Sequence, residues 1–256
     1  EDELGGCLFL RNNKGVELTE AGRSLYQQSQ HMFQNFRMMI ESVRDVNEGF
    51  RGILKVGIIY SNIPIVMDYL REYHAKYPRV ELYVRLGSPK DLLDDLNKGN
   101  LHVLFLRNSA ERVSQLHEKI LGEDPLELVM SRELDPAPDS DTIPIEALKD
   151  VPMCLLRSDD MWGYSSHLIN ECQRRGFPPN TVCQCYDTPM AMQMVQAGFG
   201  ISYLPRSIVE TTPHSALYSK PIQDLSAPSY PMLLWSENIY YANCVKQFIS
   251  MFQDKP

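Results

Sequence analysis

Several patterns that would place this chain in a membrane or in a common enzyme class are missing from its sequence. No apolar run approaches transmembrane length, and no basic stretch followed by an apolar core and a small-residue cleavage site opens the chain. The sequence also lacks a phosphate-binding loop, a dinucleotide fingerprint, a G-x-S-x-G elbow and an H-E-x-x-H pattern. We therefore expect a cytoplasmic protein that is not an enzyme, uses no cofactor and makes no membrane contact.

The spacing of the cysteines and histidines gives no indication of a metal site. The six cysteines show no C-x-x-C spacing, which argues against both a zinc site and a disulfide framework, and the six histidines lack ligand spacing. Cys183 and Cys185 fall on one predicted strand, and we expect their side chains to point to opposite faces. We therefore predict buried free thiols, no metal site and no redox sensor.

Composition is that of an ordinary globular chain. Its 256 residues are 43% hydrophobic and 23% charged, which is enough for two modest domains. The net charge of −8 argues against a protein whose whole surface binds nucleic acid. A small basic module remains compatible with it.

Two short apolar stretches flank a polar turn near the start of the chain. Residues 7–11 and 16–18 are predicted strands, joined by a turn at residues 12–15. The tip of this hairpin carries Arg11, Asn12 and Lys14, and a basic hairpin is suited to contacting DNA phosphates. The alternative is a charged tip that is merely solvated.

A single long helix is predicted from Leu18 to Val46. Its apolar residues recur every three to four positions without a proline, and at a rise of 1.5 Å per residue it would span about 40 Å. We interpret the apolar stripe as a dimer seam, and the alternative is an amphipathic helix packed on its own domain. The residues assigned to the seam are Leu18, Leu25, Met32, Phe36, Met39 and Val43.

Strand and helix patterns alternate after Gly52. Apolar strands are predicted at residues 53–59, 80–86 and 102–106, with helices begun near Pro64 and Pro89 between them. This order predicts a parallel α/β sheet whose ligand site lies at the carboxyl ends of the strands. The pattern returns in the second half of the chain. We therefore predict an α/β fold of two lobes that form a ligand-binding cleft.

Segments in both halves of the chain resemble one family. Residues 3–5, 8–11 and 15–22, the last reading Gly-Val-Glu-Leu-Thr-Glu-Ala-Gly, resemble the wing and linker start of LysR-type transcriptional regulators. Residues 195–205, Val-Gln-Ala-Gly-Phe-Gly-Ile followed by Leu-Pro, are similar to a signature in their regulatory domain. His102 stands where that family usually has an aspartate. The resemblance implies a two-lobed, periplasmic-binding-protein-like effector domain.

The resemblance also implies the division of the chain. Residues 1–18 would be the remnant of a winged helix-turn-helix, 19–51 a linker and dimerisation helix, 52–131 with 220–256 regulatory lobe I, and 132–219 lobe II. Most of the reading head is absent, so sequence-specific DNA recognition is expected to require a longer N-terminal domain. The implied partners are DNA, a small-molecule effector and a second copy in a homodimer, with pairing of dimers into tetramers left open.

The implied effector site lies between the lobes. Ser61 and Ser88 sit at predicted helix starts, where a hydroxyl and free amides suit an anion such as a carboxylate, and where simple helix capping is the alternative. Arg107 matches a position that binds ligand in family members sensing aromatic acids. The predicted effector-binding residues are Tyr60, Ser61, Asn62, Ser88, Arg107, Thr188 and Tyr203.

Two other classes compete with this interpretation. A solute-binding protein could share the two-lobed architecture, but the long helix from Leu18 to Val46 argues against it. An enzyme using the cleft would need an acid, base or nucleophile set, and the sequence shows none.

Overall fold

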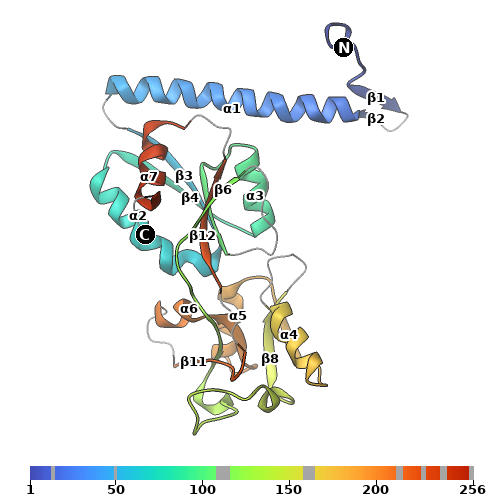
Figure 1. Cartoon of the computed structure of the whole chain (residues 1–256), viewed down its shortest axis with the longest axis vertical. Helices are drawn as coiled ribbons and strands as arrows, with labels where there is room; N and C mark the ends of the chain where they lie inside the picture. The colour runs from blue at the N-terminus through green and yellow to red at the C-terminus, as the bar shows by residue number, and fades with distance from the viewer. Residues whose placement is uncertain are drawn as a thin grey trace.

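The computed structural model describes residues 1–12, 15–48, 51–107, 116–157, 165–211, 216–225, 229–236 and 241–253. Within these ranges the side chains at positions 12, 31, 34, 37, 38 and 41–48 are not described. Two lobes are stacked along the long axis of the molecule, and helix α1 lies across the outer end of lobe I with a hairpin at its tip (Figure 1).

The long helix that follows the hairpin begins two residues later than the sequence predicts. Strands β1 (Phe9–Asn12) and β2 (Gly15–Leu18) are antiparallel, and Leu18 pairs with Phe9. Thr19 then caps the helix, because its Oγ1 accepts a hydrogen bond from the Gly22 amide at 2.9 Å. Helix α1 (Glu20–Glu48) therefore excludes Leu18, and the assignment of Leu18 to the dimer helix is wrong.

Lobe I is a five-stranded sheet covered on both faces. The strand order is β4-β3-β5-β12-β6, in which β3 runs parallel to β4 and β5 while β12 is antiparallel to its neighbours. Helices α2 and α7 pack against one face of the sheet and α3 against the other. The element bounds are β3 Gly52–Ile58, α2 Ile63–Lys76, β4 Val80–Leu86, α3 Pro89–Asn97, β5 Val103–Arg107, β6 Leu116–Ile120, β12 Pro231–Ser236 and α7 Asn243–Gln253.

Lobe II holds two smaller sheets. One has the antiparallel order β10-β7-β11, and the other pairs β8 and β9 in parallel. Helices α4, α5 and α6 complete this lobe, and α5 covers a core that includes Cys154, Val195 and Leu204. The element bounds are β7 Leu126–Met130, β8 Pro152–Leu156, α4 Ser165–Arg174, β9 Asn180–Cys185, α5 Thr188–Gln196, β10 Ser202–Pro205, α6 Arg206–Thr211 and β11 Tyr218–Lys220.

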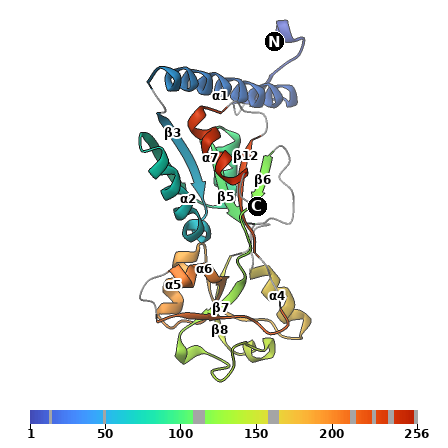
Figure 2. The ribbon, with the colours of Figure 1, turned by 60° about the vertical axis from the view of Figure 1, so that its left-hand side comes forward.

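The chain crosses between the lobes at positions that differ from the predicted boundaries. Strand β7 pairs with β10 and β11, so it belongs to lobe II and the predicted boundary after residue 131 is wrong. Ile222 bridges to Ile143 in the lobe II core, so the return crossing comes later than residue 220. The crossing segments lie side by side, because the Asp124 amide donates to the Ser229 carbonyl at 2.8 Å (Figure 2).

The glycine signature after α5 has a packing cause. The Ile201 amide donates to the Pro152 carbonyl at 2.8 Å, which brings the backbone at Gly200 against β8. A Cβ on Gly200 would lie 2.4 Å from the Pro152 carbonyl oxygen. Gly198 has φ of 80°, in the left-handed region that favours glycine. Both glycines are therefore needed for the chain to leave α5 and join the sheet.

His102 makes the free energy of unfolding depend on pH. The residue is buried, and its Nδ1 accepts a hydrogen bond from the Lys55 amide at 3.2 Å. Burial, with the charge of Lys55 nearby, lowers the pKa of His102 to about 3. Below the ordinary histidine pKa, the unfolded state therefore binds a proton that the folded state excludes, so stability falls as pH falls from about 6.5 towards 3.

We expect His102→Gln, which keeps an acceptor for the Lys55 amide, to flatten this dependence. Between pH 7 and pH 5 the loss of unfolding free energy should be smaller than in the unaltered chain by about 2 kcal/mol, at 1.36 kcal/mol per pKa unit. Urea unfolding at both pH values measures it. His74→Gln, on the exposed surface of α2, is the control and should leave the pH slope unchanged. Equal slopes in all three proteins would contradict the assignment.

Candidate functional site

The lobe junction brings together predicted effector residues from both lobes. The short helix η2 (Tyr60–Asn62) follows β3 and contacts α5, whose first residue is the buried Thr188. Ser61 and Asn62 are buried, whereas Tyr60 is 38% exposed. Parallel strands β3 and β5 both end at this edge of lobe I, as the sequence pattern predicts.

Arg107 is buried at this edge, and all three of its guanidinium nitrogens donate to other residues. Its Nη2 forms an ion pair with Asp124 Oδ2 at 2.7 Å, with both side chains less than a tenth exposed. The guanidinium also donates to Ser61 Oγ at 3.1 Å, to the Ser61 carbonyl at 2.6 Å and to Ser229 Oγ at 3.0 Å. Arg107 therefore holds η2 and both crossing segments together.

Asp124 extends this contact into lobe II. Its Oδ1 accepts from the Ser207 amide at 3.1 Å, and its Oδ2 accepts from the Ser207 hydroxyl at 2.5 Å. Ser207 lies on α6, which also packs near α2 of lobe I. A continuous polar connection, Arg107–Asp124–Ser207, therefore runs from the end of β5 through the first crossing segment to lobe II.

Ser61 and Asn62 do not act as simple helix caps. Ser61 Oγ accepts from Arg107 Nε, so its own hydroxyl hydrogen is directed elsewhere. The Asn62 side chain donates from Nδ2 to the Leu106 carbonyl at 2.6 Å and does not cap α2. Asn62 Oδ1 is buried and has no hydrogen-bond partner among the described residues.

Ser88 and Tyr203 have different surroundings. Ser88 caps α3, because its Oγ accepts from the Asp91 amide at 3.2 Å and donates to Asp91 Oδ2 at 2.8 Å. Tyr203 packs in the lobe II core with 1% exposure, and burial raises the pKa of its hydroxyl. Asp187 likewise caps α5 through the Met190 amide at 2.8 Å.

Arg157 is the cation that sequence reasoning missed. Arg157 comes directly after β8, much as Arg107 is the last residue of β5, and it is exposed. Its Nη1 donates to the Tyr186 hydroxyl at 2.7 Å, and its guanidinium lies 5.3 Å from the centre of that ring. Since β8 and β9 are parallel and α5 begins just after β9, Arg157 lies at the edge of lobe II that faces lobe I. The clue in the sequence was the position of Arg157 at the end of a predicted buried strand, which resembles the position of Arg107.

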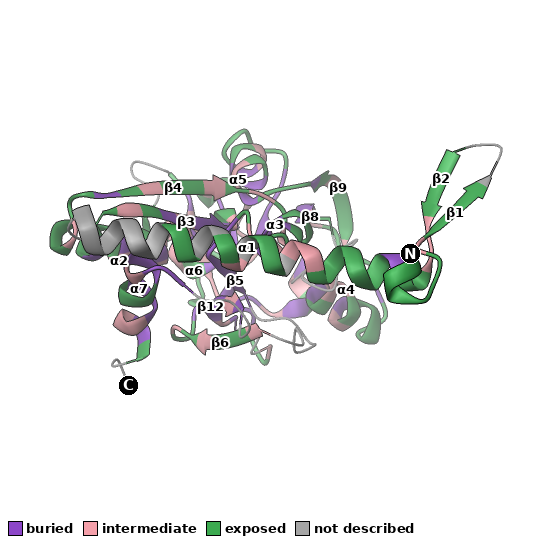
Figure 3. Cartoon of the chain, turned by 90° about the horizontal axis from the view of Figure 1, so that it is seen from above, coloured by how far each residue is buried: buried purple, intermediate pink, exposed green. Residues whose placement is uncertain are grey.

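The exposed stripe of α1 is a second candidate surface. Leu25, Met32, Phe36 and Met39, all predicted seam residues, are 40–61% exposed, and in Figure 3 the described turns of this helix are mostly exposed. We define the exposed stripe by Leu25, Met32, Phe33, Phe36, Met39 and Ile40. The side chain of Val43 lies outside the described residues. Isolated apolar side chains at a surface are ordinary, but a contiguous stripe indicates a protein interface.

The hairpin is described only in part. Arg11 is exposed on β1, the side chain of Asn12 is not described, and Lys14 lies outside the described residues. Within the described part of the chain, no helix is long and apolar enough to cross a membrane. Over the same residues, no three His, Cys, Asp or Glu side chains are grouped to hold a metal ion.

The cysteines correct two predictions. Cys7 is exposed and Cys183 is half-buried, so the thiols are not all buried. Cys183 Sγ lies 3.6 Å from Cys185 Sγ, so the prediction that they face opposite sides of the strand is wrong. Side chains alternate along a strand, which places residues two apart on the same face.

These features define a class: a two-lobed ligand-binding domain joined to a long helix with an exposed apolar stripe and a hairpin. The family model of the LysR substrate binding domain matches residues 47–256. The chain belongs to the LysR family of transcriptional regulators. The predicted family and fold class are confirmed, and the chain is a transcription regulator rather than an enzyme or a solute-binding protein.

Individual relatives agree with this assignment. The HTH-type transcriptional regulator BsdA of Bacillus subtilis is 25% identical over 253 residues, covering 98% of this chain and 87% of BsdA. The solved structure of CbnR, a LysR family transcriptional regulator, has a TM-score of 0.70 at 17% identity and covers 93% of this chain and 81% of CbnR.

Two solved effector-binding domains contain small ligands. The domain of QuiR in complex with shikimate has a TM-score of 0.67 at 16% identity and covers 78% of this chain and 94% of that domain. The domain of BenM with its effector benzoate has a TM-score of 0.64 at 17% identity and covers 79% of this chain and 90% of that domain. At these identities the likeness concerns the fold.

Proposed function

We propose that this regulator responds to a small anionic effector that binds where η2 of lobe I meets α5 of lobe II. The observation that carries the proposal is the contact between these two elements, which brings the short helix of Ser61 and Asn62 against the helix that begins at Thr188. Binding there would change the angle between the lobes and thereby the presentation of paired α1 helices and hairpins to DNA.

Several groups at the junction support an anion with a hydrogen-bond donor. The Ser61 hydroxyl hydrogen suits a carboxylate oxygen, and Arg157 supplies a positive charge from the facing lobe. Asn62 Oδ1 suits a hydroxyl or amino group of the ligand, since a buried acceptor without a partner costs free energy. Shikimate in QuiR and benzoate in BenM are both carboxylates, which agrees with this ligand class.

Arg107 acts in this proposal by positioning Ser61. Its charge is neutralised by Asp124, so the ligand does not need to supply a counter-charge. A ligand that displaces Ser61 would pull on the Arg107–Asp124–Ser207 connection, which spans both lobes. The predicted residues Ser88 and Tyr203 would then act at the periphery, as a helix cap and a core side chain.

The remaining parts of the chain serve DNA binding in this proposal. Arg11, Asn12 and Lys14 stay predicted phosphate contacts of the hairpin. The exposed stripe of α1 pairs with that of a second copy, and the homodimer brings two hairpins to one DNA site. We infer a cytoplasmic location, because that is where the DNA of a bacterium lies.

A thermal-shift screen against small carboxylates, including benzoate and shikimate, tests the proposal. A ligand that binds the folded state raises the midpoint of unfolding by mass action. For such a ligand we expect Ser61→Ala and Arg157→Ala each to weaken affinity on the order of tenfold, the worth of one charge-assisted hydrogen bond. Isothermal titration measures it.

Arg174→Ala is the matched control, because Arg174 is an exposed arginine of the same lobe, on α4. Its affinity should equal that of the unaltered chain. Ligand affinity that is unchanged in both Ser61→Ala and Arg157→Ala would exclude the junction as the effector site.

A further inference from the structure

Three cysteine side chains meet beneath α5 in lobe II. Cys154 on β8 lies opposite Cys183 in the β8–β9 ladder, where an irregularity after Met153 brings the two into register. Cys185 lies two residues along β9, with its Sγ 3.6 Å from Cys183 Sγ. All three are free thiols packed in one core cluster.

The three thiols differ in exposure. Cys183 is half-buried, whereas Cys154 and Cys185 are buried. Burial raises the pKa of the Cys154 thiol to about 11 and of the Cys185 thiol to about 12, and the adjacent Cys183 sulfur adds to both shifts. Because the thiolate is the nucleophile, these two thiols react slowly with reagents from solution. Cys183 is the one that a reagent reaches first.

We propose that Cys183 and Cys185 form a dithiol modification site that small disulfides, such as glutathione disulfide, convert to an intramolecular disulfide. The Cys183 thiolate attacks the small disulfide, forms a mixed disulfide and releases one small thiolate. Cys185 loses its proton and attacks Cys183 Sγ, and the second small thiolate leaves. Two protein thiols are oxidised, and one small disulfide is reduced to two thiols.

The backbone favours Cys185 over Cys154 as the second partner. Residues two apart on a strand have Cα atoms roughly 6.5 Å apart, within the range that a disulfide spans. Strand β8 is bridged to Ile201 as well as paired with β9, whereas β9 pairs only with β8 among the described residues and is less constrained. Cys154 is held through both of its backbone polar groups, since its amide donates to the Ile201 carbonyl at 2.8 Å and its carbonyl accepts from Ser202 Oγ at 2.6 Å.

The modification site adjoins the start of α5. The Cys185 carbonyl accepts from the Arg157 amide at 2.8 Å, and Asp187, the cap of α5, follows two residues later. Oxidation therefore changes effector affinity, a consequence that rests on the proposed function. The formation of the disulfide does not rest on that function. A peptide map of the oxidised protein tests the disulfide, and a ligand titration of the same protein tests the change in affinity, so one can fail without the other.

Trypsin mapping of the whole chain distinguishes the possible products. Cleavage after Arg175 and Arg206 places Cys183 and Cys185 in one peptide, residues 176–206, while Cys154 lies in peptide 150–157. The chain is treated with glutathione disulfide at pH 8, alkylated, digested and analysed by mass spectrometry. We expect peptide 176–206 to lose two hydrogens and to carry no alkyl group.

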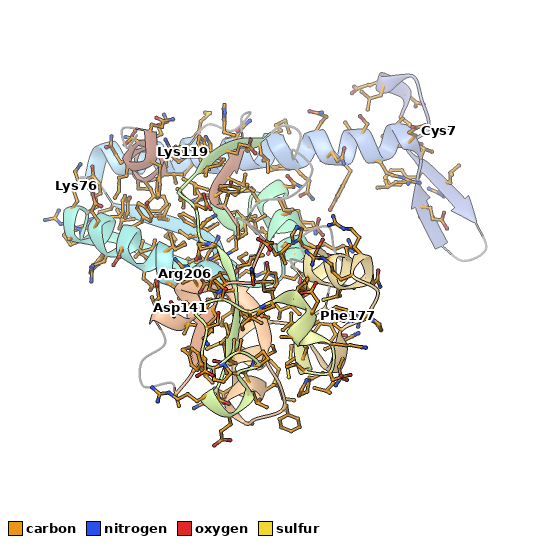
Figure 4. The ribbon with its side chains drawn as sticks, turned by 60° about the horizontal axis from the view of Figure 1, so that its bottom comes forward. Cys7, Lys76, Lys119, Asp141, Phe177 and Arg206 are labelled. Carbon is orange, nitrogen blue, oxygen red and sulfur yellow. The ribbon has the colours of Figure 1, made fainter. Side chains whose placement is uncertain are left out.

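Two other cysteines serve as internal references. Cys7, beside the hairpin and remote from lobe II (Figure 4), is exposed and should become glutathionylated, whereas the buried Cys172 should stay reduced. In Cys185→Ser the mixed disulfide at Cys183 should accumulate on the order of tenfold above the unaltered chain, because the resolving thiol is gone. Cys154→Ser should keep the disulfide within peptide 176–206.

Two results would overturn the proposal. A cross-link between peptides 150–157 and 176–206 would make Cys154 the partner instead. Reduced Cys183 and Cys185 in a sample whose Cys7 is fully glutathionylated would mean that the site does not react.

Discussion

Arg107→Met is expected to lower the free energy of unfolding by about 3–5 kcal/mol, the usual cost of leaving one partner of a buried ion pair without its counter-charge. Asp124 would remain buried beside an apolar side chain, and among the described residues its carboxylate would keep hydrogen bonds from Ser207 only. Methionine retains much of the volume of arginine, so cavity formation contributes little. Urea unfolding monitored by circular dichroism measures the change.

The matched control is Arg71→Met on α2. Arg71 pairs with Asp68 at 2.8 Å, but both side chains are more than 70% exposed. An exposed pair of this kind contributes less than about 1 kcal/mol. A second check is Arg107→Met combined with Asp124→Leu, which removes both charges and should recover much of the loss. Equal small losses in Arg107→Met and Arg71→Met would contradict the role assigned to Arg107.

Phe36→Asp is expected to break the dimer. Phe36 lies in the middle of the exposed stripe of α1 and is 58% exposed in the single chain. Pairing two such helices would bury two carboxylates in an apolar seam, at a cost of several kcal/mol each. We expect the dissociation constant of the dimer to rise by at least about a hundredfold. Sedimentation velocity across a concentration series measures it.

Gln27→Asp is the control for this experiment. Gln27 is exposed on the same helix, and at 3.6 residues per turn it lies on the opposite side from Phe36. The substitution adds the same charge outside the stripe and should leave the dimer intact. Dimers of equal stability in both variants would show that the stripe is not the seam.

Much of the fold was predictable because its causes are local. The hairpin, the long helix and the three parallel strands of lobe I follow from turn residues and from apolar spacing of two or of three to four. The Ser88 and Asp187 caps were readable for the same reason. The relation between Cys183 and Cys185 was also local, and it was missed because the two-residue period of a strand was misapplied.

The candidate site was predictable only as a region. Parallel strands carry polar residues to one edge of a sheet, so Tyr60, Ser61 and Arg107 could be placed there from their positions after strands. Whether Arg107 meets a ligand or another residue depends on Asp124, which no spacing rule connects to it. Arg157 was overlooked because the exposure of a strand-end side chain depends on what packs around it.

The amino-acid sequence thus sets the elements and their order, since hydrogen bonding within a helix or turn and side-chain periodicity involve neighbours along the chain. The lobe to which β7 belongs and the partners of Arg107 arise from the two crossings between lobes. The contact of Cys154 with Cys183 arises instead from the pairing of β8 with β9 within lobe II. In both cases residues distant in sequence are brought together, and a buried charge or thiol then takes whichever partner lies within reach. That choice depends on tertiary packing, which local patterns do not encode.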